Sequence, residues 1–223
     1  MCGRFTQSFT WAEIQNFYNL LNDLAPNLKP SWNVAPTQEI GVIGAREAGF
    51  GFTRMRWGLV PHWAKDLSMG AKLINARSDS LAEKPAFREA LVKRRCIIPA
   101  SGFFEWQGSG AAKTPWYITS AKEAEPLSFA GLWERWKSPD GEWLRSATII
   151  TTDANKGLSH LHHRMPVILT RADVETWLHE GNTALLRPCP DDAVAAWPVS
   201  GRVNNVKNDA PELIERAAPT TLF

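Results

Sequence analysis

A cysteine stands at position 2, directly after the initiator methionine. N-terminal processing removes that methionine when a small residue follows it, and Cys2 would then carry both a thiol and a free α-amine. Such an aminothiol attacks an aldehyde twice, because the amine forms an imine and the thiol then closes a thiazolidine ring. An α-amine titrates near ~7.8 and a lysine amine near ~10.4, so the terminal amine is the more reactive at neutral pH. The alternative is that Cys2 is only a small buried apolar residue.

Two further segments carry polar residues suited to such chemistry. If Leu73–Arg77 is a strand, Asn75 and Arg77 share one face, where an amide and a guanidinium could hold a sugar or a phosphate. The alternative is a turn asparagine beside a surface ion pair. Glu105 lies among the aromatic residues of Gly102–Trp106. Desolvation would raise its pKa toward neutrality and suit it to proton transfer, whereas a solvent-facing strand position would leave it an ordinary carboxylate.

The segment Ser159–Pro166 holds three of the five histidines, His160, His162 and His163. Imidazole is the natural acid or base near pH 7. A zinc site is the alternative, because two histidines separated by one residue can point to one strand face. No acidic residue lies in the segment and no pair has the HExxH spacing, so acid–base chemistry is favoured. Arg4, two residues after the cysteine, is placed to hold an anionic group.

Composition describes an ordinary globular protein of 223 residues, with 44% hydrophobic and 22% charged residues. No apolar run is long enough for a membrane span, and the three cysteines lack CxxC spacing, so a reduced, cytoplasmic location is expected. The net charge is only +2, but 15 of the 25 basic residues are arginine and 11 residues are tryptophan. Arginine and aromatic faces suit single-strand binding. We nevertheless expect at least two-thirds of the tryptophans to lie in the core.

The elements that must position these residues form an α+β pattern. Thr10 and Glu13 form a capping-box sequence before a helix expected over residues 11–22. A second helical stretch is expected over 80–93, with Pro85 at a turn inside it. Strands dominate residues 96–152, with turns at 108–110 and 138–141. A strand over 166–169, a helix opened by Thr170, and short helices over 191–196 and 211–216 follow. We predict one domain, residues 1–223, with a mostly antiparallel, barrel-like core flanked by helices.

Seven short motifs follow one another along the chain: Met1–Phe5, Trp32–Pro36, Trp57–Pro61, Ile74–Arg77, Gly102–Trp106, His162–Pro166 and Asn205–Asn208. Together they resemble the SRAP family, whose name stands for SOS response-associated peptidase. The resemblance covers nearly the whole chain, to about residue 214. It implies the SRAP α+β fold, with a β-barrel-like core flanked by helices.

The resemblance also implies a function. The family senses and shields abasic sites in single-stranded DNA, and its members link covalently to the ring-opened deoxyribose through the N-terminal cysteine. Cys2 would thus be the double nucleophile, exposed by self-processing removal of the first residue. Asn75 would position the sugar or the amine, and Glu105 would shuttle protons. His162 would handle the sugar hydroxyl, with β-elimination or reversal of the crosslink as further activities.

DNA contacts follow from the same resemblance. Backbone phosphates would be bound by Arg4, Arg77 and Arg164. The DNA channel would be shaped by Asn33, Pro36, Trp63 and Trp106. The resemblance implies no cofactor and no metal, a monomer in the cytoplasm, and association with the nucleoid when DNA is bound. Trp63-Ala64 replaces two adjacent tryptophans of some bacterial members, and Glu83–Ala86 lacks an arginine that some members carry.

Three other functions compete with this interpretation. N-terminal-nucleophile amidohydrolases also begin Met-Cys-Gly, but they carry an Asn-Gly element, and this sequence contains no Asn-Gly dipeptide. A thiol peptidase acting on other proteins is the second alternative. A DNA-binding module without chemistry, in which Cys2 is incidental, is the third. A Cys2→Ser variant separates a binding module from a protein that forms the thiazolidine.

Overall fold

The strand-rich middle of the chain closes into a five-stranded barrel in the computed structural model, which describes residues 2–21, 27–108, 110 and 113–217. Hydrogen bonds run from β10 through β4, β3, β6 and β9 and back to β10. Only β4 and β10 are parallel; the other neighbours in the ring are antiparallel. The expected barrel-like α+β core is therefore confirmed. The ring strands are β3 (Glu39–Arg46), β4 (Gly49–Trp57), β6 (Arg95–Ala100), β9 (Leu127–Lys137) and β10 (Trp143–Asp153).

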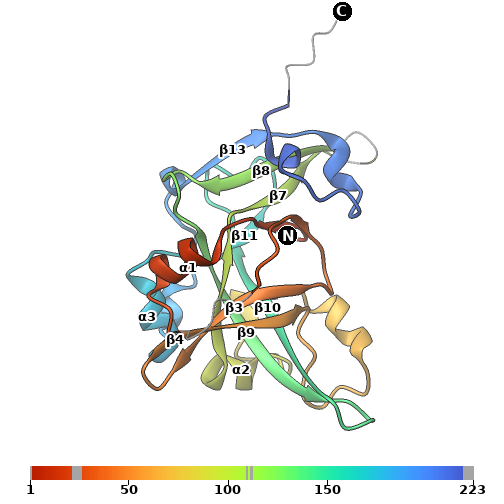
Figure 1. Cartoon of the computed structure of the whole chain (residues 1–223), viewed down its shortest axis with the longest axis vertical. Coiled ribbons are helices and arrows are strands. Elements are labelled where there is room, and N and C mark those ends of the chain that lie inside the picture. Colours follow the sequence, from red (N-terminus) through yellow and green to blue (C-terminus); the bar gives the residue numbers. More distant parts are fainter. Residues whose placement is uncertain (1, 22–26, 109, 111–112, 218–223) are drawn as a thin grey trace, which may run out of the picture.

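A second sheet of five strands lies beside the barrel and carries the beginning of the chain (Figure 1). Its order is β13-β8-β7-β1-β2, and its pairs are antiparallel. The chain passes from β6 into this sheet at Gly102, where a Cβ atom would lie 2.4 Å from the Tyr117 ring, so only glycine fits. The strands are β1 (Phe5–Gln7), β2 (Ser31–Val34), β7 (Gly102–Gln107), β8 (Thr114–Ser120) and β13 (Val194–Pro198).

Three short strands join distant segments to β9 and β10. The strand expected around Asn75 is present as β5 (Asn75–Arg77), which runs parallel to β10 with Asn75 opposite Ile149. β11 (Arg164–Pro166) is antiparallel to the last residues of β10, and β12 (Ile168–Leu169) pairs with β9. Both β5 and β11 therefore reach the C-terminal end of β10.

Helices are short and lie at the periphery. α1 (Trp11–Tyr18) has the expected capping box, but it ends earlier than the predicted residue 22, because Asn19 adopts a left-handed conformation. The helix predicted over 80–93 is wrong in its first half: Ser78–Ser80 is a 3₁₀ turn, and α2 begins at Arg88 (Arg88–Lys93). α3 spans Asp173–His179. The remaining 3₁₀ segments are Leu67–Lys72, Thr183–Leu185, Asp191–Ala193, Gly201–Asn204 and Pro211–Ile214.

The short helix predicted over 191–196 is wrong in its second half, because only Asp191–Ala193 is helical and Val194 begins β13. The turn expected at 108–110 includes residue 109, which lies outside the described residues. Of the 11 tryptophans, three are buried, six are half-buried and two are exposed. Five of the half-buried ones pack against the core clusters, so the expected share of two-thirds is reached when they are counted with the buried three. Two of the half-buried indoles, those of Trp106 and Trp197, donate their N–H to Asn204 and to the carbonyl of Ile214.

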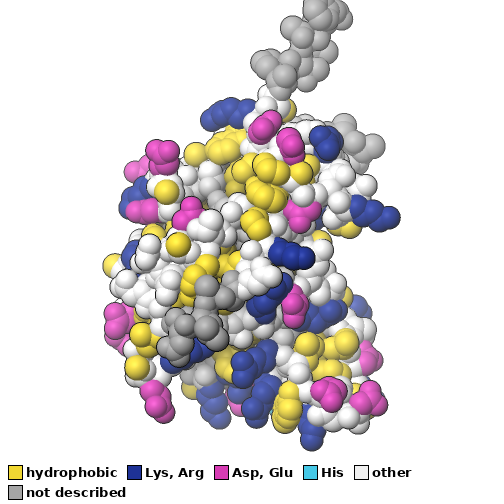
Figure 2. Space-filling model, viewed as in Figure 1, with side chains coloured by type: hydrophobic (Ala, Val, Ile, Leu, Met, Phe, Trp, Pro, Cys, Tyr) yellow, Lys and Arg dark blue, Asp and Glu magenta, His cyan; other side chains and the backbone are white. Residues whose placement is uncertain are grey.

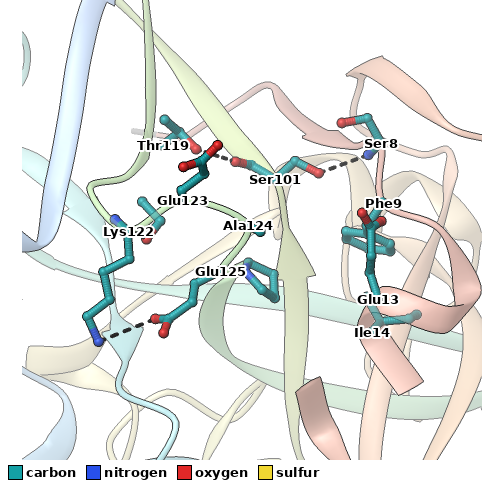
Figure 3. A pocket seen from close by; sticks show the side chains of 12 residues that line it. Ser8, Phe9, Glu13, Ile14, Ser101, Thr119, Lys122, Glu123, Ala124 and Glu125 are labelled. Carbon is teal, nitrogen blue, oxygen red and sulfur yellow. Dashed lines mark hydrogen bonds and ion pairs between the residues drawn. The ribbon is translucent and has the colours of Figure 1, made fainter. Parts of the chain in front are cut away.

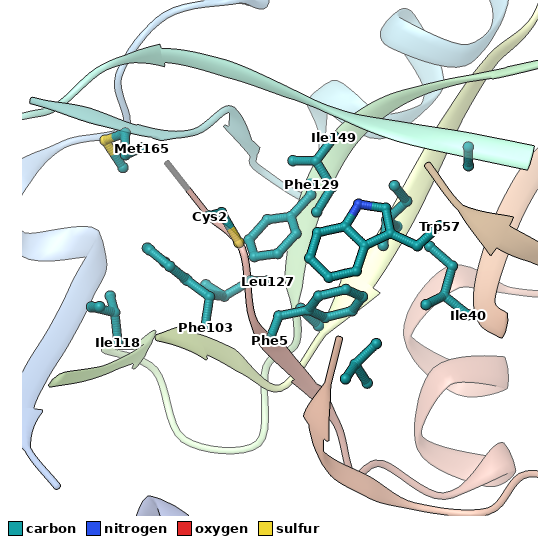
Figure 4. Packing of buried hydrophobic residues seen from close by; sticks show 14 of the residues in the cluster. Cys2, Phe5, Ile40, Trp57, Phe103, Ile118, Leu127, Phe129, Ile149 and Met165 are labelled. Carbon is teal, nitrogen blue, oxygen red and sulfur yellow. The ribbon is translucent and has the colours of Figure 1, made fainter. Parts of the chain in front are cut away.

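One apolar core joins the second sheet to the barrel (Figure 4). Phe5, Phe103 and Ile118 of the second sheet pack in the same cluster as Trp57 and Phe129 of the barrel. Phe5 contacts Trp57 edge-on, with ring centroids 4.9 Å apart. This shared core sets the relative position of the two sheets. Within the described part of the chain, no helix has the length and apolar character needed to cross a membrane.

Candidate active site

Cys2 lies in the core between the two sheets, just before β1. Its side chain is fully buried, and Figure 4 shows it among aromatic and aliphatic residues such as Phe103 and Leu127. The sulfur lies 3.8 Å from the carbonyl oxygen of Arg4. Burial raises the pKa of the Cys2 thiol, and the nearby carboxylate of Glu105 raises it further. The thiol is therefore protonated at neutral pH and needs a base when it reacts.

Asn75 contacts the cysteine directly. Its Nδ2 donates to the carbonyl oxygen of Cys2 at 2.8 Å. Side chains alternate along β5, and the side chain of Ala76 is buried. Asn75 and Arg77, on either side of it in sequence, therefore point to the opposite face of the strand. The Oδ1 atom of Asn75 is buried and has no hydrogen-bond partner among the described residues. Asn75 thus anchors the start of the chain and keeps a buried acceptor beside it.

Glu105 occupies the middle of β7, opposite Trp116 of β8. Its side chain is 6% exposed, and burial raises its pKa. The desolvation expected from its aromatic neighbours is therefore present. A carboxyl group with a raised pKa can both hold and release a proton near neutrality. Its negative charge raises the pKa of the Cys2 thiol.

His162 shares a narrow pocket with Glu105, whose other walls are mainly apolar. Its Nδ1 accepts the backbone N–H of Arg164 at 2.9 Å, so the neutral ring carries its proton on Nε2. Burial lowers the pKa of His162, and the neighbouring His163, stacked at 4.2 Å between ring centroids, lowers it further. The neutral imidazole therefore predominates at neutral pH. The pocket is lined by Phe103, Glu105, Ile118, Leu158, Leu161, His162, Arg164 and Met165.

The four predicted catalytic residues thus come from four separate segments and meet at one place. Asn75 is bonded to Cys2, the carboxylate of Glu105 acts on the Cys2 thiol, and His162 lines the same pocket as Glu105. The thiol must lose a proton when it reacts; Glu105, which acts on it electrostatically, and His162, in the pocket of Glu105, are both able to accept one. The arrangement can carry out nucleophilic addition with proton transfer in a site that largely excludes water.

Among the predicted DNA contacts, Arg4 and Asn33 join one hydrogen-bonded network. Arg4 Nη1 donates to Asn33 Oδ1 at 2.7 Å and to the carbonyl of Val203 at 2.9 Å. Asn33 is 1% exposed, and its Nδ2 donates to three carbonyls of the 203–208 loop, at 2.6 to 3.4 Å. Trp106 donates its indole N–H to Asn204 in the same loop. The loop is thereby held against β2 and β7.

This burial leads to a stability prediction. Replacing Asn33 with alanine leaves several carbonyls and the Arg4 guanidinium without their partner, so we expect a loss of about 2 kcal/mol in the free energy of unfolding. Urea denaturation measures this. Asn33→Asp should lose at least as much, because it keeps the acceptor but removes the donor. The exposed Asn16→Ala serves as the control. Wild-type stability of both Asn33 variants would contradict the structural role.

Arg77 and Arg164 pair with acidic residues that the sequence did not single out. The exposed Arg77 donates to both carboxylate oxygens of Asp79, at 3.2 and 2.6 Å. Arg164 is 4% exposed; its Nη1 lies 2.8 Å from Asp153 and 3.6 Å from Asp79, and its Nη2 donates to the carbonyl of Thr151. The spacing of Arg77 and Asp79 signals their pairing, whereas Asp153 meets Arg164 only through the β10–β11 ladder. Phosphate binding by these arginines stays a prediction.

Pro36 and Trp63 lie on surface loops. Pro36 is half-buried in the turn after β2, and Trp63 is 49% exposed. The following Ala64 is buried and accepts the indole N–H of Trp136 at 2.7 Å. Position 64 is therefore part of the packing beneath the loop, and Trp63 is the aromatic surface that the loop presents.

A larger pocket lies away from these residues (Figure 3). It is formed by the start of α1 and the loop after β8, and its walls include Ser8, Glu13, Ser101 and Lys122. Glu13 is engaged in the capping box, and Lys122 pairs with Glu125 at 3.4 Å. None of the predicted site residues lines this pocket. Across the described residues, no three His, Cys, Asp or Glu side chains gather as they would around a metal ion.

Comparison with known proteins identifies the family. Residues 1–206 match the family described as SOS response associated peptidase, SRAP. The chain belongs to the SRAP family. The chain is 44% identical to "Abasic site processing protein YoqW" of Bacillus subtilis, over 96% of this chain and 99% of that protein. It is 38% identical to "Abasic site processing protein HMCES" of Gallus gallus, over 72% of this chain and 56% of that protein.

Solved structures agree with this SRAP assignment at the level of the fold. A protein from Bacteroides thetaiotaomicron superposes with a TM-score of 0.86 at 29% identity, covering 97% of this chain and all of that one. A protein from Bordetella bronchiseptica gives a TM-score of 0.77 at 24% identity, covering 89% of this chain and all of that one. The whole SRAP chain therefore shares its architecture with these proteins.

Proposed function

We propose that this SRAP protein processes abasic sites in single-stranded DNA by linking covalently to them through Cys2. The names of its relatives supply the class of lesion. The observation that carries the proposal is the position of Cys2, whose carbonyl is held by Asn75 and whose thiol lies near the desolvated carboxyl of Glu105. A merely structural cysteine would not need these two polar neighbours.

The chemistry begins when removal of Met1 exposes the amine of Cys2. The amine adds to the aldehyde carbon of the ring-opened deoxyribose, and the resulting carbinolamine loses its hydroxyl as water. Glu105, with its raised pKa, donates the proton that this leaving hydroxyl needs. The thiol then adds to the imine carbon and passes its proton to the carboxylate. One water is lost in total, and a thiazolidine joins protein and DNA.

His162 and Asn75 complete the proposed mechanism. The neutral His162 ring, with its proton on Nε2, exchanges protons with the sugar hydroxyl during ring opening. The same ring can take a proton from the sugar in β-elimination or in reversal of the linkage. The buried Oδ1 of Asn75 accepts a hydrogen bond from the cysteine amine or the sugar. Removal of Met1 is proposed to be self-processing at the same site.

DNA binding is proposed to use residues that contact the DNA directly and buried residues that hold those contacting residues in position. The exposed Trp63 and the exposed Arg77 contact the strand, by stacking and by phosphate binding. Arg4 and Asn33 hold the 203–208 loop and thereby set the wall of the channel next to Trp106. Arg164, which is nearly fully buried, orients Asp79 and so positions Arg77.

Intact mass spectrometry tests this function. Purified protein is mixed with a single-stranded oligonucleotide that carries one abasic site, and we expect a species with the mass of both molecules minus one water. The protein part should lack Met1. An undamaged oligonucleotide of the same sequence is the control. A protein that lacks Met1 and is folded, yet forms no adduct with the damaged strand, would sink the proposal.

A further inference from the structure

A second cationic site lies on the barrel, outside the residues assigned above. It is a pocket between β4 and the β9–β10 hairpin. Figure 2 shows Lys and Arg side chains gathered over the lower part of the molecular surface. We call it the arginine pocket and define it by five of its lining residues: Arg54, Arg56, Arg135, Trp143 and Arg145. The carboxylate in its lining is Glu39, which pairs with Arg54 at 3.3 Å.

The hairpin places like charges against each other. Arg135 of β9 and Arg145 of β10 are direct cross-strand partners, so both guanidinium groups project from one face. Lys137 is the direct partner of Trp143 on the same face. Like charges opposite each other in an antiparallel pair destabilise a sheet, and an anion bound between them removes that cost. The pairing of Arg135 with Arg145 is therefore better explained by anion binding than by packing of the hairpin.

Among the four arginines of the pocket, Arg54 is the one that pairs with a carboxylate in the described chain. Neither Arg135 nor Arg145 has a carboxylate or a side-chain hydrogen-bond acceptor among the described residues within bonding distance. Arg56 donates from Nη1 to the carbonyl of Thr37, but its Nε is buried and has no hydrogen-bond partner in the described chain. Phosphate oxygens are the acceptors that a cluster of guanidinium donors fits, because they can take two parallel hydrogen bonds.

An aromatic face lies among these charges. Trp143 is 57% exposed, and the Arg135 guanidinium lies 4.3 Å from its ring centroid. Lys137 Nζ lies 5.7 Å from the same centroid. A large exposed ring beside cations is suited to stack on an unpaired base while its neighbours bind the adjoining phosphates. Paired bases in a duplex offer no such face along the strand.

The pocket adjoins the candidate active site through one loop. Thr37, which accepts from Arg56, directly follows Pro36 of the predicted DNA channel. Trp57 directly follows Arg56 and donates its indole N–H to the carbonyl of Ile74, the residue before Asn75. Thr37 also lines the arginine pocket, so the 36–37 turn connects the predicted DNA channel with the pocket.

From these observations we propose that the arginine pocket binds the continuation of the DNA strand whose abasic site occupies the Cys2 site. This proposal rests on the proposed function for the identity of the ligand. The pocket takes phosphates on Arg135, Arg145 and Arg56 and one unpaired base on Trp143. It lengthens the binding site beyond the lesion and holds the strand before any covalent bond forms.

The test compares undamaged single strands of about 6 and about 20 nucleotides, shorter and longer than one typical single-strand site, by fluorescence anisotropy. The double variant Arg135→Gln/Arg145→Gln should bind the long strand about tenfold more weakly and lower its salt dependence by roughly 1.4 in log–log slope, as expected for two lost phosphates. Binding of the short strand should stay unchanged. Trp143→Ala should weaken binding of the long strand by about tenfold without changing the salt dependence of that binding.

The control is Arg88→Gln/Arg187→Gln, which removes two exposed arginines elsewhere and changes the net charge equally. Equal weakening by the control would overturn the proposal in favour of general electrostatics, as would unchanged affinity of the long strand in both pocket variants. Weakened binding of duplex alone would also overturn it. Adduct formation with a short abasic strand is scored separately, so loss of the proposed function and loss of the pocket are distinguishable.

Discussion

Replacing Cys2 with serine is expected to abolish the stable adduct with abasic DNA while leaving the initial imine. Once Met1 has been removed, which intact mass must show, the serine variant has the α-amine and can still condense with the aldehyde, but its hydroxyl is too weak a nucleophile to close the ring. Denaturing gels with and without borohydride measure this. Without reductant no shifted band should remain, and with reductant the trapped imine should appear.

Two comparisons make this result specific. Cys189→Ser changes another buried thiol and should retain the adduct. Thermal unfolding of Cys2→Ser must show a folded protein, because the sulfur packs in the core between the sheets. A reductant-independent adduct that persists in the folded Cys2→Ser protein would rule out the thiazolidine.

Replacing Glu105 with glutamine is expected to slow the linkage by about 10² to 10⁴-fold, the usual contribution of a positioned general acid or base. Glutamine keeps the shape and the hydrogen-bonding capacity of the side chain but cannot carry the proton between the leaving hydroxyl and the thiol. The rate of adduct formation under single-turnover conditions measures the effect. An unchanged rate would remove Glu105 from the mechanism.

The same substitution should stabilise the protein. Burial raises the pKa of Glu105, so the folded state opposes ionisation of this carboxyl. The resulting destabilisation is present above the folded-state pKa and disappears as the pH falls below the ordinary value for glutamate. We therefore expect the melting temperature of Glu105→Gln to exceed that of wild type at neutral pH, and the two to converge in acid.

Glu134→Gln is the matched control for stability. Glu134 is equally buried, but it accepts from Arg94 at 2.8 Å and lies 3.5 Å from His62. Removing its charge leaves the half-buried Arg94 paired only with the exposed Glu89, at 3.2 Å, among the described residues, so the melting temperature should fall. If the melting temperatures of Glu105→Gln and Glu134→Gln changed in the same direction, desolvation would not be the reason for the effect at Glu105.

Local patterns predicted many of the elements. The capping box of Thr10 and Glu13 marked the start of α1. The apolar and aromatic runs of 96–152 marked β6 to β10, which the fold divides between the barrel and the second sheet. The turn expected at Pro85 is present, but the helical stretch expected before it is made of turns instead, and α2 begins only at Arg88. It failed again at Val194, because pairing with β8 overrides the helical tendency of an alanine-rich segment.

The candidate chemistry was also visible in residue types. Residue types alone indicate proton-coupled addition, from a cysteine next to the initiator, a glutamate among aromatic residues and a histidine cluster. Burial then changed the interpretation of several binding residues. Asn33 and Arg164 are polar and were expected at the DNA, but both are almost fully buried and make hydrogen bonds within the protein. Sequence position carries no information on burial when the partners are backbone carbonyls.

By itself the sequence determined the reactive groups and the order of the elements, because thiol, carboxyl and imidazole chemistry and strand alternation are local properties. Only the tertiary structure decided which groups meet. β5 brings Asn75 to the Cys2 carbonyl through its pairing with β10, and β7 brings Glu105 to the thiol. The pKa shifts follow from burial between two sheets, which depends on the packing of residues more than a hundred positions apart, as with Phe5 and Phe129.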